Sequence, residues 1–451
     1  MAGHSYFVVV DESMQQLQVT AHFAAPVHAI SARAADAGRY VRAIADCDSG
    51  RSLTTRGRRV RLPDAGIRCL EYRVDLARAA RHERRNRTLS DANVIVSPAS
   101  WLWRPPIDAD TPVTVRFDVP DSMHVFVPWQ RLPGSEHAYR VLASPQTWTA
   151  PAVFGDFVYR EVAIPGATLR VSVLRSDGDI DSDELIDWVR DTASNVTLAY
   201  GQFPNPSPSV VILPVGSGRR SASPVPFGRV IRDGGETVEL LVNEGMPIDA
   251  FYDDWTATHE FSHLMLPYVS SRHRWISEGF AQYYQNLLLA RGGQYDERRA
   301  WQKLVEGFER GRRSSPGLSP NQAASRGGRG STMKIYWSGA AIALLADVEL
   351  RRRSDGAESL DTVLAELKRC CLPADSAWNG QRLFAQLDAF AGEPVFMPLY
   401  RRHANTAGFP SLAATLAQLG VELDDGRVSL NDSAPLAALR RAMTVPSTET
   451  L

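Results

Sequence analysis

The residues of this chain best suited to metal chemistry are two histidines four positions apart. His259 and His263 enclose Glu260 in the stretch His-Glu-Phe-Ser-His, and Glu278 follows after a gap of fourteen residues. On a helix, positions i and i+4 lie on one face, so both imidazoles can reach one ion. Catalytic zinc takes three protein ligands and keeps a fourth position for water. The spacing therefore predicts one zinc ion per chain, bound by His259, His263 and Glu278, with Glu260 left as the general base.

Two helices are expected to position these ligands. The segment 248–258 contains neither glycine nor proline, and its apolar residues follow helical spacing into the histidines. Pro267 cannot continue that helix, and a second apolar-periodic segment runs from 275 to a Gly-Gly pair at 292–293. Glu278 is therefore expected on about the first turn of the next helix. The alternative is that both histidines are structural and the glutamate is unrelated.

The surrounding residues resemble the gluzincin zinc metallopeptidases, and most nearly the glycyl aminopeptidase family. The likeness covers about 150–370 and is carried by the His-Glu-Phe-Ser-His stretch and by the segments 275–284 and 336–351. It implies a thermolysin-like catalytic domain that hydrolyses peptide bonds of a peptide or protein substrate with a metal-activated water. Tyr336, three residues before Gly339, matches the tyrosine that hydrogen-bonds the oxyanion in such enzymes. A packed aromatic residue is the alternative reading of Tyr336.

Two departures from the family leave the specificity open. Aminopeptidase-type relatives carry a strand whose glutamate holds the substrate amine, but here Ile231 and Arg232 stand at that place, and Ser338 replaces a lysine. An aminopeptidase and an endopeptidase both remain open, as does hydrolysis of a non-peptide bond. A hypothesis from another class is a catalytically lapsed gluzincin domain that acts as a binding or scaffold protein. The intact ligand set with Glu260 argues against it.

The chain is expected to be an α+β multidomain protein. Residues 1–165 alternate polar and apolar positions, which predicts an N-terminal β-sandwich-like domain. Residues 166–292 mix strands and helices and would form the zinc-binding, thermolysin-like α/β catalytic domain. Within it, the runs 225–232 and 236–242 predict a hairpin. The resemblance makes its edge a place for extended substrate, and an ordinary sheet edge is the alternative. Residues 293–451 are predicted to form a helical C-terminal domain.

The segment 311–332 is rich in glycine, serine, proline and arginine. This composition is typical of a mobile loop. It leads directly to Tyr336, so it could close over the site as a lid or extend into solvent, and the sequence does not separate these alternatives.

Composition limits the partners and leaves the compartment open. Among 451 residues, 50 Lys and Arg balance 51 Asp and Glu, so the net charge of −1 favours no nucleic acid partner. We expect no membrane span, because no apolar run approaches eighteen residues, and the chain as given begins without a signal peptide. The protein would be exported or periplasmic if a signal peptide has been removed, and cytoplasmic otherwise. The oligomeric state is not predicted.

Four cysteines do not decide the compartment either. Cys47 and Cys69 could bridge within the β region, but free thiols are favoured for all four. The adjacent Cys370 and Cys371 are not expected to pair, because a bond between neighbours is strained. Because relatives in the resembled family are exported, a disulfide between Cys47 and Cys69 remains an alternative.

Overall fold

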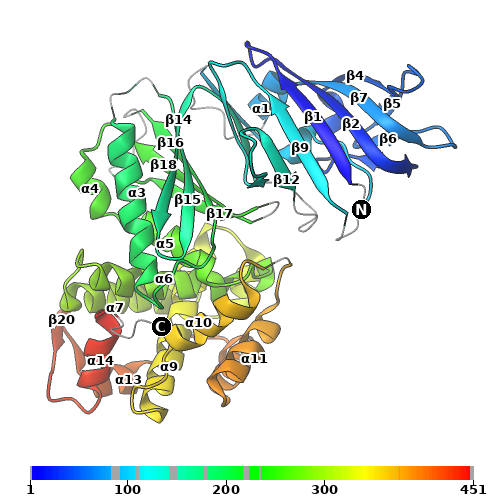
Figure 1. The fold of residues 1–451 in the computed structure, drawn as a ribbon. Coiled ribbons are helices and arrows are strands. Elements are labelled where there is room, and N and C mark those ends of the chain that lie inside the picture. The colour runs from blue at the N-terminus through cyan, green and yellow to red at the C-terminus, as the bar shows by residue number, and fades with distance from the viewer. Residues whose placement is uncertain are drawn as a thin grey trace. The chain divides into compact units, whose positions relative to one another are not determined.

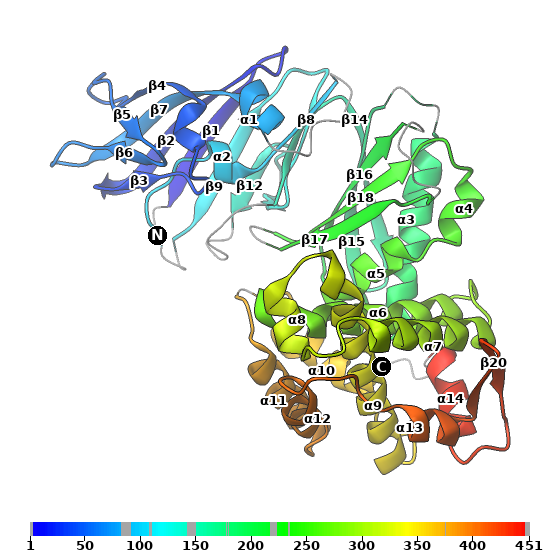
Figure 2. The same ribbon diagram turned by 180° about the vertical axis from the view of Figure 1, so that it is seen from behind.

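The fold is mixed α/β, with several sheets and many helices. The structure is a computed structural model that describes residues 3–82, 92–107, 111–141, 150–176, 178, 180–216, 223–232, 235–374 and 376–446. Its contacts divide the chain into two compact units, described separately here (Figures 1 and 2). The first contains 1–162, 169–186 and 208–246, and the second contains 163–168, 187–207 and 247–451. The three-domain division expected from the sequence stays a prediction.

A seven-stranded mixed sheet lies in the first unit. Its central strand β1 (His4–Val10) pairs antiparallel with β2 (Gln16–Val27) and parallel with β9 (Val113–Asp118). Alternate residues of β1 are buried, as the sequence pattern predicts for a strand with one face on the core. The sheet order is β11-β12-β9-β1-β2-β7-β4, and the other strands are β4 (Val41–Ala45), β7 (Ile67–Asp75), β11 (Gln130–Arg131) and β12 (Ala138–Val141).

Two small sheets complete this β region. One has the order β3-β6-β5 and the other β10-β13-β8. Their strands are β3 (Ile30–Ser31), β5 (Thr54–Arg56), β6 (Arg59–Arg61), β8 (Asn93–Val96), β10 (His124–Phe126) and β13 (Ala152–Gly155), with the short helices α1 (Leu76–His82) and α2 (Pro98–Trp101) alongside in sequence. The large buried rings Trp101, Trp103 and Phe154 belong to its core.

A five-stranded sheet precedes the histidine motif in the chain. Its order is β14-β15-β16-β18-β17, with β15, β16 and β18 parallel and β17 antiparallel to β18. The strands are β14 (Phe157–Ile164), β15 (Ala167–Leu174), β16 (Ser209–Val215), β17 (Phe227–Ile231) and β18 (Thr237–Asn243). The predicted hairpin is therefore confirmed, although Asp233 and Gly234 of its turn lie outside the described residues.

Both glutamates of this hairpin are ion-paired within it. The Nε atom of Arg229 donates to Oε2 of Glu239 over 2.6 Å. Nε of Arg232 lies 3.9 Å from Oε1 of Glu236. The sequence places an arginine where relatives are expected to carry an amine-binding acid. The structure adds that the neighbouring acids already face cations.

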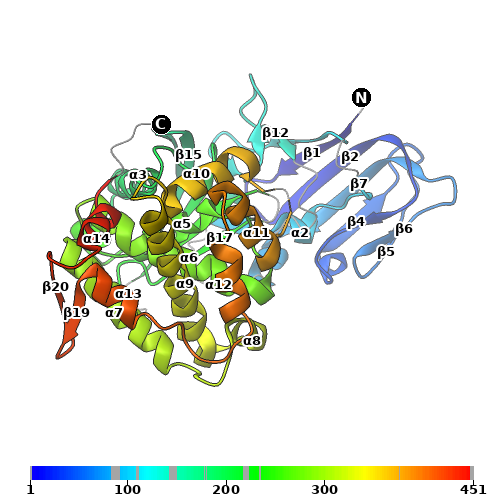
Figure 3. The same ribbon diagram turned by 90° about the horizontal axis from the view of Figure 1, so that it is seen from below.

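Helices dominate the second unit. The long helices α6 (Arg274–Arg291), α7 (Glu297–Arg313) and α9 (Thr332–Arg353) pack together, and Figure 3 shows α9 beside α6. The C-terminal part adds α10 (Leu360–Cys371), α11 (Gly380–Ala391), α12 (Phe396–His403), α13 (Ala413–Leu419) and α14 (Ala437–Thr444). The predicted Asp-Gly hairpin is present as β19 (Val421–Asp424) and β20 (Arg427–Leu430). No described helix is both long and apolar enough to cross a membrane.

The crossing of α6 and α9 is unusually close. A Cβ atom at Gly279 would overlap the backbone of Gly339, and one at Gly339 would overlap the carbonyl oxygen of Trp275. Farther along, Asp361 of α10 accepts from Arg291 of α6 over 2.9 Å and from Arg351 of α9 over 3.3 Å. Glycines and a buried ionic cluster therefore fix how the helices carrying Glu278 and Tyr336 meet.

Two sequence expectations about local structure are wrong. The helix before the histidines is broken into α4 (Ile248–Tyr252) and α5 (Thr256–Ser262), because Oδ1 of Asp254 accepts from the amide of Thr256 over 2.7 Å and starts a new helix. The segment 311–332 is also not a loop throughout. Within it, α8 (Pro320–Arg326) has a capping box on the buried Ser319.

Both pairs of cysteines are bonded, which corrects the expectation of free thiols. Cys47 and Cys69 form a disulfide with Cα atoms 5.3 Å apart. The neighbours Cys370 and Cys371 are also joined. The first bond forms because β7, which contains Cys69, pairs with β4, which ends two residues before Cys47.

Candidate metal centre

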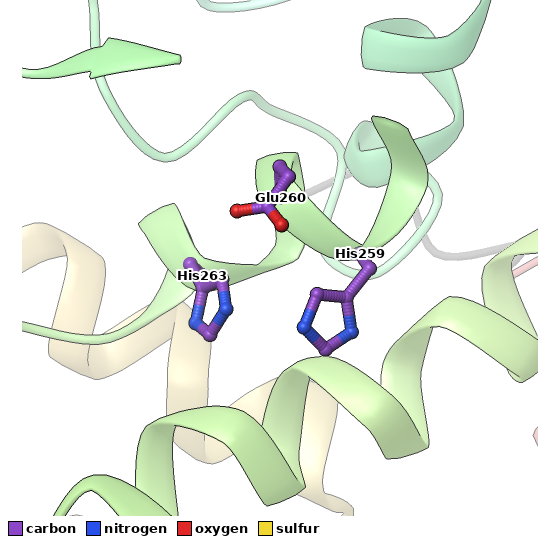
Figure 4. Close-up of side chains that lie close together, drawn as sticks. All are labelled: His259, Glu260 and His263. Carbon is purple, nitrogen blue, oxygen red and sulfur yellow. The ribbon is translucent and has the colours of Figure 1, made fainter. Parts of the chain in front are cut away.

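The helix α5 presents both histidines on one side. His259 lies within it and His263 begins the 3₁₀ turn that follows, so their ring centroids are 4.8 Å apart. Figure 4 shows the two imidazoles side by side, with the carboxylate of Glu260 next to them. The ligand atoms of these three residues lie within 4.8 Å of one another. This group could hold a metal ion.

Glu278 of α6 approaches the same two rings. Its Oε2 atom lies 3.4 Å from Nε2 of His259 and 3.4 Å from Nε2 of His263. The side chain is 23 % exposed, yet Oε2 is buried and accepts no hydrogen bond from any described residue. A buried carboxylate oxygen without a donor is costly unless a cation faces it. Two imidazole nitrogens and this oxygen form the donor set that zinc prefers, so the residues fit a zinc ion.

Hydrogen bonds on the far side of each ring set its orientation. Nδ1 of His259 lies 3.1 Å from Oε1 of Gln285, and Nδ1 of His263 lies 2.9 Å from Oγ of Ser277. Such bonds leave Nε2 of each ring for a metal. Sequence reasoning did not find either partner. Helical spacing offered a signal, since Gln285 lies about two turns after Glu278 on the same helix.

The charges of the site are strongly coupled in the metal-free protein. Burial alone would raise the pKa of Glu278, but the two histidines outweigh it and hold that pKa well below its usual range. Burial opposes protonation of His259, but the neighbouring carboxylates of Glu278 and Glu260 raise its pKa overall. Burial raises the pKa of Glu260. Glu278 is therefore suited to stay ionised as a ligand, and Glu260 to accept a proton.

Tyr336 reaches this centre from α9. Its ring stacks on that of His259, with centroids 5.6 Å apart and planes 13° from parallel. Burial and then the charge of Glu278 raise the pKa of its hydroxyl. The phenol therefore stays protonated and can donate a hydrogen bond. All five residues singled out from the sequence, His259, Glu260, His263, Glu278 and Tyr336, thus converge within the second unit.

A family model and several solved structures are similar to this chain. The model of the M61 glycyl aminopeptidases matches residues 265–327, a stretch that includes Glu278 but not His259, His263 or Tyr336. No curated protein matches the chain significantly.

The solved structures share the fold at low sequence identity. An aminopeptidase N family protein from Idiomarina loihiensis is 15% identical with a TM-score of 0.70, over 93% of this chain and 79% of that one. The M1 zinc metallopeptidase from Deinococcus radiodurans is 16% identical with a TM-score of 0.52, over 91% of this chain and 94% of that one. A mutant of the Deinococcus enzyme bound to a Tyr-Ser-Ala substrate is 14% identical with a TM-score of 0.54, over 91% and 95%.

Proposed function

We propose that this chain is a metallopeptidase, most like the glycyl aminopeptidase family, and that it hydrolyses peptide bonds with one zinc ion held by His259, His263 and Glu278. One observation carries the proposal. The buried Oε2 of Glu278 lies 3.4 Å from both imidazole nitrogens and accepts no hydrogen bond from the described residues. A cation between these three atoms relieves that cost.

The chain's own groups supply the proton transfers. Zinc bound there would provide Lewis acidity, which makes water more acidic and polarises a substrate carbonyl. Glu260, whose pKa is raised by burial, takes the proton of the attacking water and passes it to the amide nitrogen as the carbon–nitrogen bond breaks. Tyr336 donates to the carbonyl oxygen as negative charge develops on it. The products are one carboxylic acid and one amine.

The finer architecture belongs to the same proposal. We assign residues 1–165 to a β-sandwich-like domain, 166–292 to a thermolysin-like catalytic domain and 293–451 to a helical domain. The support is the run of strands before residue 165, the mixed five-stranded sheet before α5, and the helices after Arg291.

Metal analysis and peptide hydrolysis test the proposal. Purified protein should hold close to one zinc ion and hydrolyse members of a mixed peptide library, and a chelator should abolish both. Glu260→Gln should keep zinc and lose nearly all hydrolysis, because its carboxylate moves protons and is not a ligand. Tyr336→Phe should keep zinc and lose about 100-fold in kcat. A Glu260→Gln variant as active as the parent would remove Glu260 from this role.

The second candidate function is that of a catalytically lapsed domain with a binding or scaffold role, and it leads to the opposite prediction about hydrolysis. Its support is the fully buried Ser338, whose hydroxyl finds no described partner at a place where relatives carry lysine. Under that candidate, zinc-loaded protein binds peptides without cleaving any of them.

We also propose an exported or periplasmic location. The support is the two disulfides, because such bonds persist in oxidising compartments. Fractionation of cells that produce the native chain tests this, and recovery of the protein with reduced cysteines in the cytoplasm would overturn it.

A further inference from the structure

Arg274, the first residue of α6, lies beside the proposed metal centre and is a cation without an anionic partner among the described residues. Its side chain makes no hydrogen bond or ion pair with any described residue, and its Nε atom is buried. A guanidinium has five donors and no acceptor, so burying part of it unpaired is costly. At the start of an 18-residue helix the macrodipole also disfavours a cation. Both costs favour an anion that the described part of the chain does not itself provide.

The position of Arg274 brings its charge near the residues that are proposed to act in hydrolysis. It lies four residues before Glu278 on α6, which places the two side chains on one face of the helix. Its charge also acts on the hydroxyl of Tyr336, whose pKa it lowers against the larger effects of burial and Glu278. Gly327 is also nearby, since a Cβ atom there would lie 4.0 Å from Nη2 of Arg274.

The backbone around Arg274 is held firmly. Nδ1 of His273 lies 3.1 Å from Oγ of Ser270, and its Nε2 lies 3.1 Å from the hydroxyl of Tyr400. On the following residue, Nε1 of Trp275 donates to Oδ1 of Asn321 over 2.8 Å. The guanidinium is therefore presented from a rigid element, as recognition of a charged group requires.

We propose that Arg274 selects substrates by binding a carboxylate close to the scissile peptide bond. This inference rests on the proposed peptidase function. Peptides offer carboxylates from two sources, the C-terminal end of a short peptide and the side chain of Asp or Glu, and the guanidinium fork matches either one. The enzyme would then recognise an acidic group of its substrate, whereas amine-selecting relatives recognise an ammonium group.

Matched peptides distinguish the two sources. One pair is Ala-Ala-Ala with a free or an amidated C-terminus. A second set is amidated and carries Glu or Gln on either side of the cleaved bond. We expect kcat/KM to favour the anionic member of at least one pair by about tenfold or more, the range of a charge-assisted hydrogen bond. The pair that shows the preference identifies the source of the carboxylate.

Variants of Arg274 test whether this residue causes the preference for anionic peptides. Arg274→Gln should reduce it to about twofold while zinc content and the thermal midpoint stay unchanged, and Arg274→Lys should retain part of it. Arg272→Gln is the matched control, because Arg272 is exposed on the preceding 3₁₀ turn and its loss should leave the preference intact.

Other outcomes separate this inference from the proposed function. If neutral and anionic peptides are cleaved equally by the parent, the carboxylate role is wrong and the peptidase function stands. If Arg274→Gln lowers kcat equally for all peptides, Arg274 acts through Tyr336 and the inference is overturned. If no peptide is cleaved by zinc-loaded protein, the proposed function fails and the inference fails with it.

Discussion

At the scale of residues, the imidazole nitrogens of the proposed metal centre are oriented by groups that are not among the proposed ligands. Gln285 holds Nδ1 of His259 and Ser277 holds Nδ1 of His263. Each bond fixes the ring plane and leaves Nε2 for the ion. This places part of the metal affinity in residues outside the His-Glu-Phe-Ser-His motif.

Removal of one such group should weaken metal binding without removing it. Gln285→Ala is expected to lower zinc affinity about 10- to 100-fold, because the His259 ring is free to rotate. Competition with a chromogenic chelator measures the change. Gln282→Ala is the control, since Gln282 is also buried on α6 but makes no side-chain hydrogen bond to either histidine. Equal affinities for the two variants would contradict this role for Gln285.

At the scale of elements, the α6–α9 crossing sets the distance between the helix that carries Glu278 and the helix that carries Tyr336. Gly279 and Gly339 allow the two backbones to touch, one position after Glu278 and three after Tyr336. A side chain at either position must push the helices apart, because it would meet backbone and not a flexible side chain.

Gly339→Ala should therefore destabilise the protein and slow hydrolysis. Overpacking costs about 1–3 kcal/mol, and separation of the helices moves the Tyr336 hydroxyl away from the centre. The unfolding midpoint and kcat measure the two effects. Gly317→Ala is the control, because nothing lies within 4 Å of a Cβ atom there. Unchanged stability in Gly339→Ala would show that the helices separate easily.

The β17–β18 hairpin supports a prediction about the substrate's amino end. The resemblance assigns amine recognition to this strand, but Glu239 faces Arg229 and Glu236 faces Arg232. Acetylated and free peptides should then differ by less than about tenfold in kcat/KM, or about 1.4 kcal/mol. Parallel assays of one peptide, with its amino terminus acetylated or free, measure this difference. A strong requirement for the free amine would restore an aminopeptidase function, with Glu244 the remaining acid nearby in sequence.

At the scale of the whole molecule, the two disulfides differ in how much chain they enclose. Cys47 and Cys69 are 22 positions apart, whereas Cys370 and Cys371 are adjacent. A cross-link stabilises mainly by restricting the unfolded chain, and that restriction grows with the enclosed loop. The adjacent pair encloses none.

Removal of the first bond should be the costly change. Cys47→Ser with Cys69→Ser is expected to lower the free energy of unfolding by about 3 kcal/mol. Cys370→Ser with Cys371→Ser should change it by less than about 1 kcal/mol, since no loop is released. Denaturant unfolding of both double variants, monitored in the first and second units separately, measures the difference. A larger loss in the second pair would contradict the loop argument.

Much of the centre follows from the sequence, because helical spacing is a local property. His259 and His263 share a face of one helix wherever it packs, and Gly292 marks the end of the helix that carries Glu278. The hairpins at 227–243 and 421–430 also follow from alternation and turn residues. These features depend on residues close together in the chain.

Other features were decided only by the tertiary structure. The disulfide between Cys47 and Cys69 depends on strands that only the fold brings together. The break before α5 and the helix in 320–326 begin at local caps on Asp254 and Ser319, which hydrophobic periodicity and composition do not register. The absence of a described partner for Arg274 is visible only once every helix is placed. Local spacing determines which side chains share a face, whereas burial and pairing depend on what long-range packing brings to that face.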